Sequence, residues 1–210
     1  MGKVGEVVVP EDGLGPSKQE RIVVAALDVF GQHGAAKSTL QMVAEAAGVS
    51  VGLVQHHFGS KDRLVDAVNA HALGVIRAEM ARPLTASSGE SVLEMGRRVS
   101  FLLSQQLTAV DYLARLLVEG APAGAAFFDS TAEIGLARWR RLADEGGTVE
   151  NLDLVWAALN PLVLVMGAVI MRRHIDRHLP EPFVTPAQLQ RWRDAINRLL
   201  ERGQIRRPVE

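Results

Sequence analysis

Residues 38–61 read STLQMVAEAAGVSVGLVQHHFGSK, and this stretch decides the fold of the chain. Ser38 stands at an N-cap position, before apolar residues that recur at helical spacing. Gly48 can adopt the left-handed backbone conformation that ends a helix sharply. Ser50 is then placed to cap a second, short helix over residues 51–58. The stretch therefore predicts two helices joined by a tight glycine turn, followed by the capped start of a third helix.

The short helix predicted over residues 51–58 has more polar residues than a core helix. Val54 and Phe58 lie four residues apart and form its buried side, while the residues between them are all polar. Two helices around a glycine turn, with polar side chains on the second, are typical of a helix-turn-helix, which places its second helix in the major groove of DNA. The pattern therefore predicts a DNA-contacting surface on this helix.

A further helix is predicted before this stretch. Ser17 and Glu20 form a capping-box pattern, and Gly34 follows the last apolar residue. The buried face of this helix is expected to contain Ile22, Ala26, Leu27 and Phe30. Three helices with two tight connections make a compact head over residues 17–64. Because a head of about fifty residues is small for its surface, we expect the rest of the chain to stabilise it.

The three predicted helices resemble the N-terminal domain of the tetracycline-repressor (TetR) family of bacterial regulators. The resemblance covers residues 17–65 and is carried by an ordered string of small, apolar and capping residues. These residues are Ile22, Ala25, Ala26, Phe30, Gly34, Val43, Ala44, Ala47, Gly48, Val49, Ser50, Gly52, Val54, His56, His57, Phe58, Ser60, Lys61 and Leu64.

The resemblance implies an all-α fold in two domains. The helix-turn-helix domain would span residues 17–64, and residues 65–210 would form a helical domain for ligand binding and dimerisation. The resemblance further implies a homodimer that binds a palindromic operator in double-stranded DNA. We expect a repressor that a small apolar or amphipathic effector releases from DNA, by changing the angle of a helix over residues 62–81 and so the spacing of the two heads. The residues do not distinguish a repressor from an activator.

The composition fits a helical protein without disulfides. The 210 residues are 48% hydrophobic but only 5% aromatic, which favours an aliphatic, helical core. There is no cysteine, which excludes disulfides and thiolate metal sites and fits a reducing cytoplasm. The net charge of −1 argues against strong nonspecific DNA binding, so a dimer would be needed to gather enough phosphate contacts. Residues 1–16 lack a signal-peptide layout, so we expect a mobile arm and a cytoplasmic protein.

The chain after residue 64 is predicted to be helical, because no segment alternates apolar and polar residues as a strand would. A stripe of Leu64, Val68, His71 and Val75 is expected to be buried, and Gly203 is expected to end the last helix. The expected helices cover residues 62–81, 91–109, 111–119, 125–145, 152–175 and 186–202, with a loop at residues 85–90.

Residues 154–171 contain no charged side chain and allow two interpretations. A run of this length is the lower end of a membrane span, and the other interpretation is a helix covered by protein. We favour burial, because Asn160 and Pro161 interrupt the run. This helix and the last one, from each of two chains, would form an intersubunit four-helix bundle, as the resemblance also implies. The expected dimer interface contains Leu159, Leu162, Met166, Leu189, Trp192, Ile196 and Leu199.

The candidate DNA contacts lie in and around the helix over residues 51–58. Its first residues can approach base edges, and its polar residues can hydrogen-bond to bases or phosphates. For some contacts a structural role is the alternative: Gln41 would close a capping box, His57 would pack against the head, and Lys61 would be an ordinary surface lysine. The expected contacts are Lys37, Thr39, Gln41, Val51, Gly52, Leu53, Gln55, His56, His57 and Lys61.

Aromatic and methionine side chains in the second part of the chain are candidates for the wall of a ligand cavity. Each of them, taken alone, more often belongs to a core. The expected cavity residues are Met80, Phe101, Tyr112, Phe127, Trp139, Trp156 and Met166.

Two other classes of protein are alternatives to a ligand-responsive regulator. An enzyme would use the His56–His57 pair, or a metal ion held by His174 and His178. No nucleophile, paired acid and base or third metal ligand accompanies these histidines, so we expect no enzyme, no catalytic residue, no metal and no cofactor. The second alternative is a DNA-binding regulator that is constitutive or tethered to a membrane.

Overall fold

The computed structural model describes residues 16–82 and 88–206, and every regular element in these residues is a helix. The helices are α1 (Lys18–His33), α2 (Leu40–Ala47), α3 (Val51–Phe58), α4 (Lys61–Met80), α5 (Ser88–Gln105), α6 (Leu107–Val118), α7 (Pro122–Asp144), α8 (Leu154–Ile170), α9 (Arg172–Ile175), the 3-10 helix η1 (Asp176–His178) and α10 (Pro186–Gln204). In the described residues, one isolated β-bridge joins Thr148 and Ile205. The expected all-α fold is confirmed. The expected arm falls on residues 1–15, which lie outside the described residues, apart from residue 16. Residues 85–87 of the expected loop also lie outside them, whereas residues 88–90, expected in the loop, are the first turn of α5.

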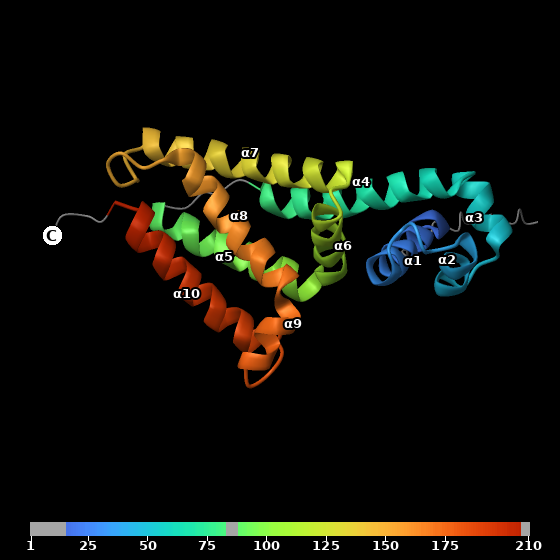
Figure 1. Cartoon of the computed structure of the whole chain (residues 1–210). Coiled ribbons are helices and arrows are strands. Elements are labelled where there is room, and N and C mark those ends of the chain that lie inside the picture. Colours follow the sequence, from blue (N-terminus) through green and yellow to red (C-terminus); the bar gives the residue numbers. More distant parts are fainter. Residues whose placement is uncertain (1–15, 83–87, 207–210) are drawn as a thin grey trace, which may run out of the picture.

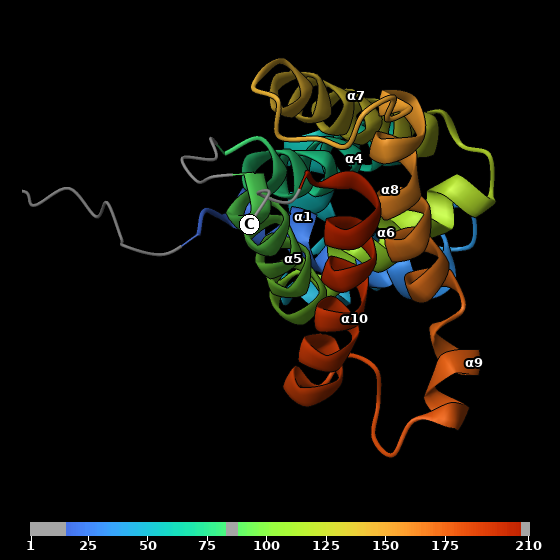
Figure 2. The ribbon, with the colours of Figure 1, turned by 90° about the vertical axis from the view of Figure 1, so that its left-hand side faces the viewer.

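The molecule has two parts that α4 connects (Figure 1). The head, made of α1 to α3, lies at one end, and α5, α8 and α10 lie toward the other end. Because α4 runs without a break from the head into the second part, the expected boundary after residue 64 falls inside a helix. α10 packs against α5, and α7 packs against α6 and α8. A view turned by 90° shows α10 between α5 and α8 (Figure 2).

Each helix of the head begins on a side-chain cap. Ser17 Oγ accepts a hydrogen bond from the Glu20 amide at 3.2 Å, and Glu20 Oε2 accepts one from the Ser17 amide at 2.7 Å. This reciprocal pair is the expected capping box. Gly48 ends α2 in the left-handed region, at φ 65°, as expected. The residues expected on the inner face of α1 are all buried, namely Ile22, Ala26, Leu27 and Phe30.

The expected N-cap of α2 is wrong by one residue. Thr39 is the cap, because its Oγ1 accepts a hydrogen bond from the Met42 amide at 3.2 Å. Ser38 is buried, and its hydroxyl donates to the Gly34 carbonyl oxygen at 2.8 Å, which satisfies the end of α1 instead. Gln41 therefore closes no capping box, and its amide donates to Glu45 Oε1 at 3.0 Å.

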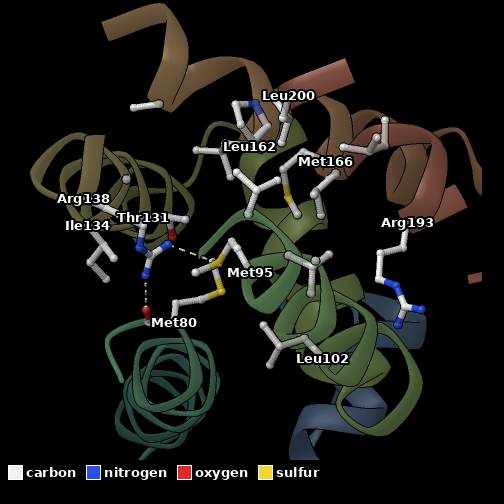
Figure 3. A pocket seen from close by; sticks show the side chains of 18 of the residues that line it. Met80, Met95, Leu102, Thr131, Ile134, Arg138, Leu162, Met166, Arg193 and Leu200 are labelled. Atoms are coloured by element: carbon white, nitrogen blue, oxygen red, sulfur yellow. Dashed lines mark hydrogen bonds between the residues drawn. The ribbon is translucent and has the colours of Figure 1, made fainter. Parts of the chain in front are cut away.

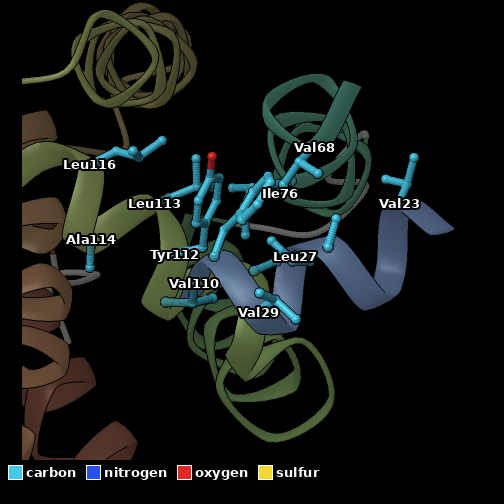
Figure 4. Packing of buried hydrophobic residues seen from close by; sticks show 14 of the residues in the cluster. Val23, Leu27, Val29, Val68, Ile76, Val110, Tyr112, Leu113, Ala114 and Leu116 are labelled. Atoms are coloured by element: carbon cyan, nitrogen blue, oxygen red, sulfur yellow. The ribbon is translucent and has the colours of Figure 1, made fainter. Parts of the chain in front are cut away.

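The centre of the molecule is α6, which packs against α1, α4, α7 and α8. Figure 4 shows Tyr112 and Leu113 of α6 directed toward Ile76 of α4 and Leu27 of α1. The Tyr112 hydroxyl donates to Asn69 Oδ1 at 2.7 Å, so the one polar atom of this buried ring is satisfied. Burial, together with the nearby Glu119 charge, raises the pKa of Tyr112 to about 12.

The expected stripe on α4 is wrong in its second half. The buried residues are Leu64, Val68, Ala72 and Ile76. His71 and Val75 are only half-buried. A strict four-residue repeat keeps the buried side turned toward α1 and α6, against which α4 packs along its length.

Long-range contacts explain why other helix ends differ from the expected ones. Asp111 was expected to begin a helix, but it lies inside α6, and its carboxylate accepts two hydrogen bonds of 2.9 Å from Arg172. α7 was expected to begin at residue 125, but it begins at Pro122, because a missing N–H group in the first turn leaves no helical hydrogen bond unmade. Gly203 lies inside α10, whose last residue, Gln204, accepts a hydrogen bond from the Val149 amide at 3.1 Å.

The apolar run at residues 154–171 forms α8 and ends where the chain bends. Leu162, Met166 and Val169 are buried on one side of α8, and its other side is exposed. No single helix in residues 16–82 and 88–206 has the length and hydropathy of a membrane span. α8 meets these two criteria only together with the residues up to His178, across a bend of 69°.

Candidate functional site

The surface of α3 is the first candidate site. Val54 is fully buried and Phe58 nearly so, and these two side chains hold α3 against the rest of the head. Gly52, Gln55 and His56 are exposed and share one side of the helix, because they are three and four residues apart. The Ser50 hydroxyl fixes the start of α3 by accepting a hydrogen bond from the Leu53 amide at 3.2 Å. A short, capped helix thus presents polar side chains on a rigid base.

Two lysines lie at the edge of this surface. The Lys61 ammonium donates to the Ala36 carbonyl oxygen at 3.2 Å, which brings the first residue of α4 next to the exposed Lys37. Thr39 is exposed at the start of α2, close in sequence to this pair. Helix N-termini and lysines both favour a negatively charged partner. The edge of the head therefore suits phosphate groups.

The structure places the other expected DNA contacts on the same part of the head. Gln41 is exposed on α2, where it bonds to Glu45. Val51 and Leu53 are half-buried at the start of α3. His57 is exposed, so it is not packed in the head, and its ring stands edge-on to the His56 ring with centroids 5.6 Å apart.

A cavity in the second part of the molecule is the second candidate site (Figure 3). It has a volume of about 140 Å³ and lies between α4, α5, α6, α7, α8 and α10. Its wall is almost entirely apolar, with the few polar groups coming from Ser91, Thr131, Arg138, Arg193 and Asn197. A cavity of roughly 150 Å³ can hold a benzene-sized molecule, so a longer ligand would have to displace side chains or helices. Flexible methionine side chains in the wall suit such a displacement.

The cavity contains some of the expected ligand residues but not all. Its wall includes Met80, Phe127, Trp139 and Met166. Tyr112 lies outside it, in the core between α1, α4 and α6. Phe101 and Trp156 are exposed on the surface, with exposed fractions of 46% and 57%. Helical spacing alone did not reveal which side of α5 and of α8 faces inward.

Arg138 was not among the expected residues, although α7 carries a signal for it. Phe127, Thr131, Ile134 and Arg138 follow one another at helical spacing and all line the cavity. A single charge on an otherwise apolar stripe is the feature that marks this position. The guanidinium donates to the Met80 carbonyl oxygen at 3.1 Å and to Met95 Sδ at 3.2 Å, as Figure 3 shows.

α4 and α6 connect the cavity with the head. Ile76 of α4 and Val110 of α6 line the cavity. On the other side of α6, the Arg115 guanidinium donates to the Gly31 carbonyl oxygen at 3.3 Å, at the end of α1. A shift of α6 or α4 at the cavity would therefore act directly on the head.

An exposed apolar face formed by α8 and α10 is the third candidate site. It contains Val155, Trp156, Val163, Leu164 and Leu199, whose exposed fractions range from 39% to 63%. A shallow groove between the two helices is lined by Trp156, Val163, Leu164 and Leu199 among others. Apolar patches of this kind mark interaction sites on proteins.

Most residues expected at the dimer interface do not lie on this face. Leu162, Met166, Trp192 and Ile196 line the cavity. Leu189 is buried, and Leu159 is half-buried. Leu199 is the exposed member of the expected set. The expected helices are thus the ones with an open apolar face, but the side of each helix differs from the expectation.

The histidines near the end of α8 form no group suited to a metal ion. His174 Nδ1 lies 2.8 Å from the Arg177 guanidinium, and both residues are exposed. Within the described part of the chain, no three histidine, cysteine, aspartate or glutamate side chains come together as metal ligands would.

The head matches a known family model. Residues 22–68 match the model described as bacterial regulatory proteins of the tetR family. The HTH-type transcriptional regulator BetI of Brucella anthropi is 34% identical over 83 residues, which are 40% of this chain and 41% of that protein. The chain thus spans about two fifths of the length of the curated relative that it matches.

Solved structures resemble the whole fold. The ketosteroid transcriptional regulator KstR2 of Mycobacterium tuberculosis has a TM-score of 0.69 at 17% identity, and the match covers 93% of this chain and 98% of that one. SmeT, the repressor of the multidrug efflux pump SmeDEF of Stenotrophomonas maltophilia, has a TM-score of 0.69 at 21% identity, with 92% and 93% covered. At these identities the likeness concerns the fold. The match of residues 22–68 assigns the head to the tetR family of bacterial regulatory proteins, and the likeness of the fold supports a TetR-family transcriptional regulator.

Proposed function

We propose that this chain is a homodimeric transcriptional repressor that binds a palindromic DNA operator and leaves it when a small apolar or amphipathic molecule binds. The observation that carries the DNA-binding part is the exposed polar face of α3, held by Ser50, Val54 and Phe58 next to Lys37 and Lys61. Gln55 and His56 read base edges in the major groove, and the lysines hold phosphates. A regulator of chromosomal DNA works in the cytoplasm.

The proposed dimer is supported by the small number of bases that one head can contact. One short helix contacts only a few bases, and the exposed apolar face of α8 and α10 suits a second copy of the chain. In a two-fold symmetric dimer, this face of one chain packs against the same face of the other chain. Two heads about 34 to 36 Å apart reach successive major grooves, so the operator is expected to be an inverted repeat.

Release by a ligand is supported by the position of the cavity. Its wall includes Ile76 and Met80 of α4, the helix that leads into the head. The cavity is small, so a ligand longer than a single ring spreads the helices around it. Such a ligand binds the spread state better than the closed one, which is the condition for coupling to DNA binding.

The DNA-binding proposal is tested by selecting duplexes from a random pool and measuring affinity with variants. We expect an inverted repeat to be enriched. Replacing His56 by alanine is expected to weaken binding to this site by roughly ten- to hundredfold, because a base contact is lost. Lys61→Ala is expected to weaken all duplexes alike and to lower the slope of affinity against salt by about one.

His178→Ala is the matched control. His178 is an exposed histidine in η1, outside the head, so its loss should leave DNA affinity unchanged. No enrichment of any duplex, or equal effects of His56→Ala and His178→Ala, would contradict the assignment of α3. A screen in which no small molecule changes operator affinity would leave the alternative, a constitutive regulator.

A further inference from the structure

The wall of the cavity contains one cation in an unusual setting. Arg138 is partly buried on the inner stripe of α7, and the residues around it in the wall are mostly apolar. In residues 16–82 and 91–206, no carboxylate lies within ion-pair distance of its guanidinium. Its hydrogen-bond partners there are the Met80 carbonyl oxygen and the Met95 thioether, which is a weak acceptor.

The neighbouring charges do not compensate Arg138. Arg98 has its own acid, since its Nε donates to Glu94 at 3.1 Å, and Arg141 lies 3.8 Å from Glu145. Burial, followed by the positive charges of Arg98 and Arg141, lowers the pKa of Arg138 to about 10. The side chain is therefore still protonated near pH 7, and the described side chains offer it no counter-charge.

A cation at the wall of an apolar cavity pairs best with a ligand that has both an anionic group and an apolar portion. We propose that the effector is an amphipathic carboxylate, whose carboxyl group pairs with Arg138 and whose apolar part fills the cavity beside Met80, Met95 and Met166. The inference rests on the proposed function, in that it names the chemical class of the effector. A planar guanidinium binds a carboxylate through two parallel hydrogen bonds, which makes the pair strong as well as specific.

The same residue gives the carboxylate a way to act on the head. Met80 is the last residue of α4, and Arg138 satisfies its carbonyl oxygen, which has no helical partner. A carboxylate that draws the guanidinium away takes this bond from the end of α4. Binding of the carboxylate and the position of α4 are therefore coupled through the Arg138 side chain.

The test compares ligands that differ only in the charged end. Binding of hexanoate, decanoate and benzoate to the full-length protein is measured by calorimetry, beside the matching alcohols and trimethylammonium compounds. At least one carboxylate is expected to bind roughly ten- to hundredfold more tightly than its alcohol, the range for a hydrogen bond to a charged group. The trimethylammonium compounds are expected to bind most weakly.

Variants of α7 assign the preference to one residue. Arg138→Met keeps a side chain of similar length and should bind the carboxylate and the alcohol equally. Arg138→Lys keeps the charge without the paired hydrogen bonds and should retain a reduced preference. Arg141→Met removes the same charge from the same helix outside the cavity and should behave like the unchanged protein.

A carboxylate preference that is absent, or that survives Arg138→Met, overturns the inference, as does a failure of every carboxylate to bind. Operator affinity without ligand is measured in parallel for each variant. If an alcohol releases the operator while no carboxylate does, the effector class is wrong and the proposed function stands. If the ligand-free protein binds no operator, the proposed function itself fails, whatever the cavity binds.

Discussion

The head and the second part of the molecule are built by different rules. In the head, the N-cap side chains of α1, α2 and α3 each accept a hydrogen bond from their own helix. Gly48 and Gly59 end α2 and α3 with positive φ angles. In the second part, Asp153 caps α8 in the same way, but the N-cap residues of α6, α7 and α10 make no such side-chain bond. The first turns of these three helices are therefore not fixed by a side-chain cap.

This difference suits the two proposed tasks. A surface that reads DNA needs fixed positions, and local caps fix the helices of the head whatever happens elsewhere. A cavity whose wall must move is better made from helices that are held by packing. Sequence similarity follows the same division, because the family model matches residues 22–68.

The largest effect on operator binding is expected from breaking the proposed dimer contact, in which the second part of one chain packs against the second part of the other. Leu164→Glu and Leu199→Glu each put a charge on the exposed apolar face of α8 and α10. Both should give monomers and weaken operator binding by at least about a hundredfold, since one head alone makes too few contacts. Light scattering and DNA titration measure the two effects.

Val118→Glu is the control for these two variants. Val118 is the exposed apolar residue at the end of α6, and it does not lie on the face of α8 and α10. It should leave the dimer and operator binding intact. An unchanged protein that is monomeric at micromolar concentration would refute the proposed interface.

Changes in stability of intermediate size and opposite sign are expected from alanine substitutions at two glycines. Gly48→Ala forces a side chain into the left-handed region at φ 65° and should lower the free energy of unfolding by about 1 to 2 kcal/mol. Gly74 lies inside α4, beyond the head, and a Cβ there meets no atom within 4 Å. Gly74→Ala should therefore raise the stability by about 0.5 to 1 kcal/mol. Denaturant unfolding measures the change in the free energy of unfolding for each variant. Changes of the same sign in the two variants would contradict this prediction.

A smaller effect than that of Gly48→Ala is expected at the junction between the two parts. Tyr112→Phe removes the hydrogen bond to Asn69 and should cost about 1 kcal/mol at neutral pH. Because burial raises the pKa of Tyr112 to about 12, against an ordinary value near 10, the unfolded chain loses this proton first. The tyrosine thus lowers stability as the pH rises from about 10 to 12, and the phenylalanine does not.

The expected result is a gap between the two proteins that narrows above about pH 10. Unfolding by urea at a series of pH values measures it. A gap that stays constant up to pH 12 would show that the tyrosine ionises equally in the folded and unfolded chain.

The sequence by itself determined the head. Capping and left-handed glycine positions are local properties, so the bounds of α3 and the burial of Val54 and Phe58 were predictable. The exception is the cap of α2. Ser38 and Thr39 are adjacent and equally able to cap, and the end of α1, which needs a donor for the Gly34 carbonyl oxygen, decides between them.

The tertiary structure decided what the second part does with its apolar helices. α8 is apolar on nearly all sides, so its sequence does not say which side faces in. Packing against α6 and α7 turns Leu162 and Met166 to the cavity and leaves Trp156 and Leu164 outside. The role of Arg138 also depends on the tertiary structure, because its charge faces a cavity only when the helices opposite α7 are in place. In the head, local chemistry fixes where most helices begin and end, whereas the role of each helix face in the second part depends on its neighbours.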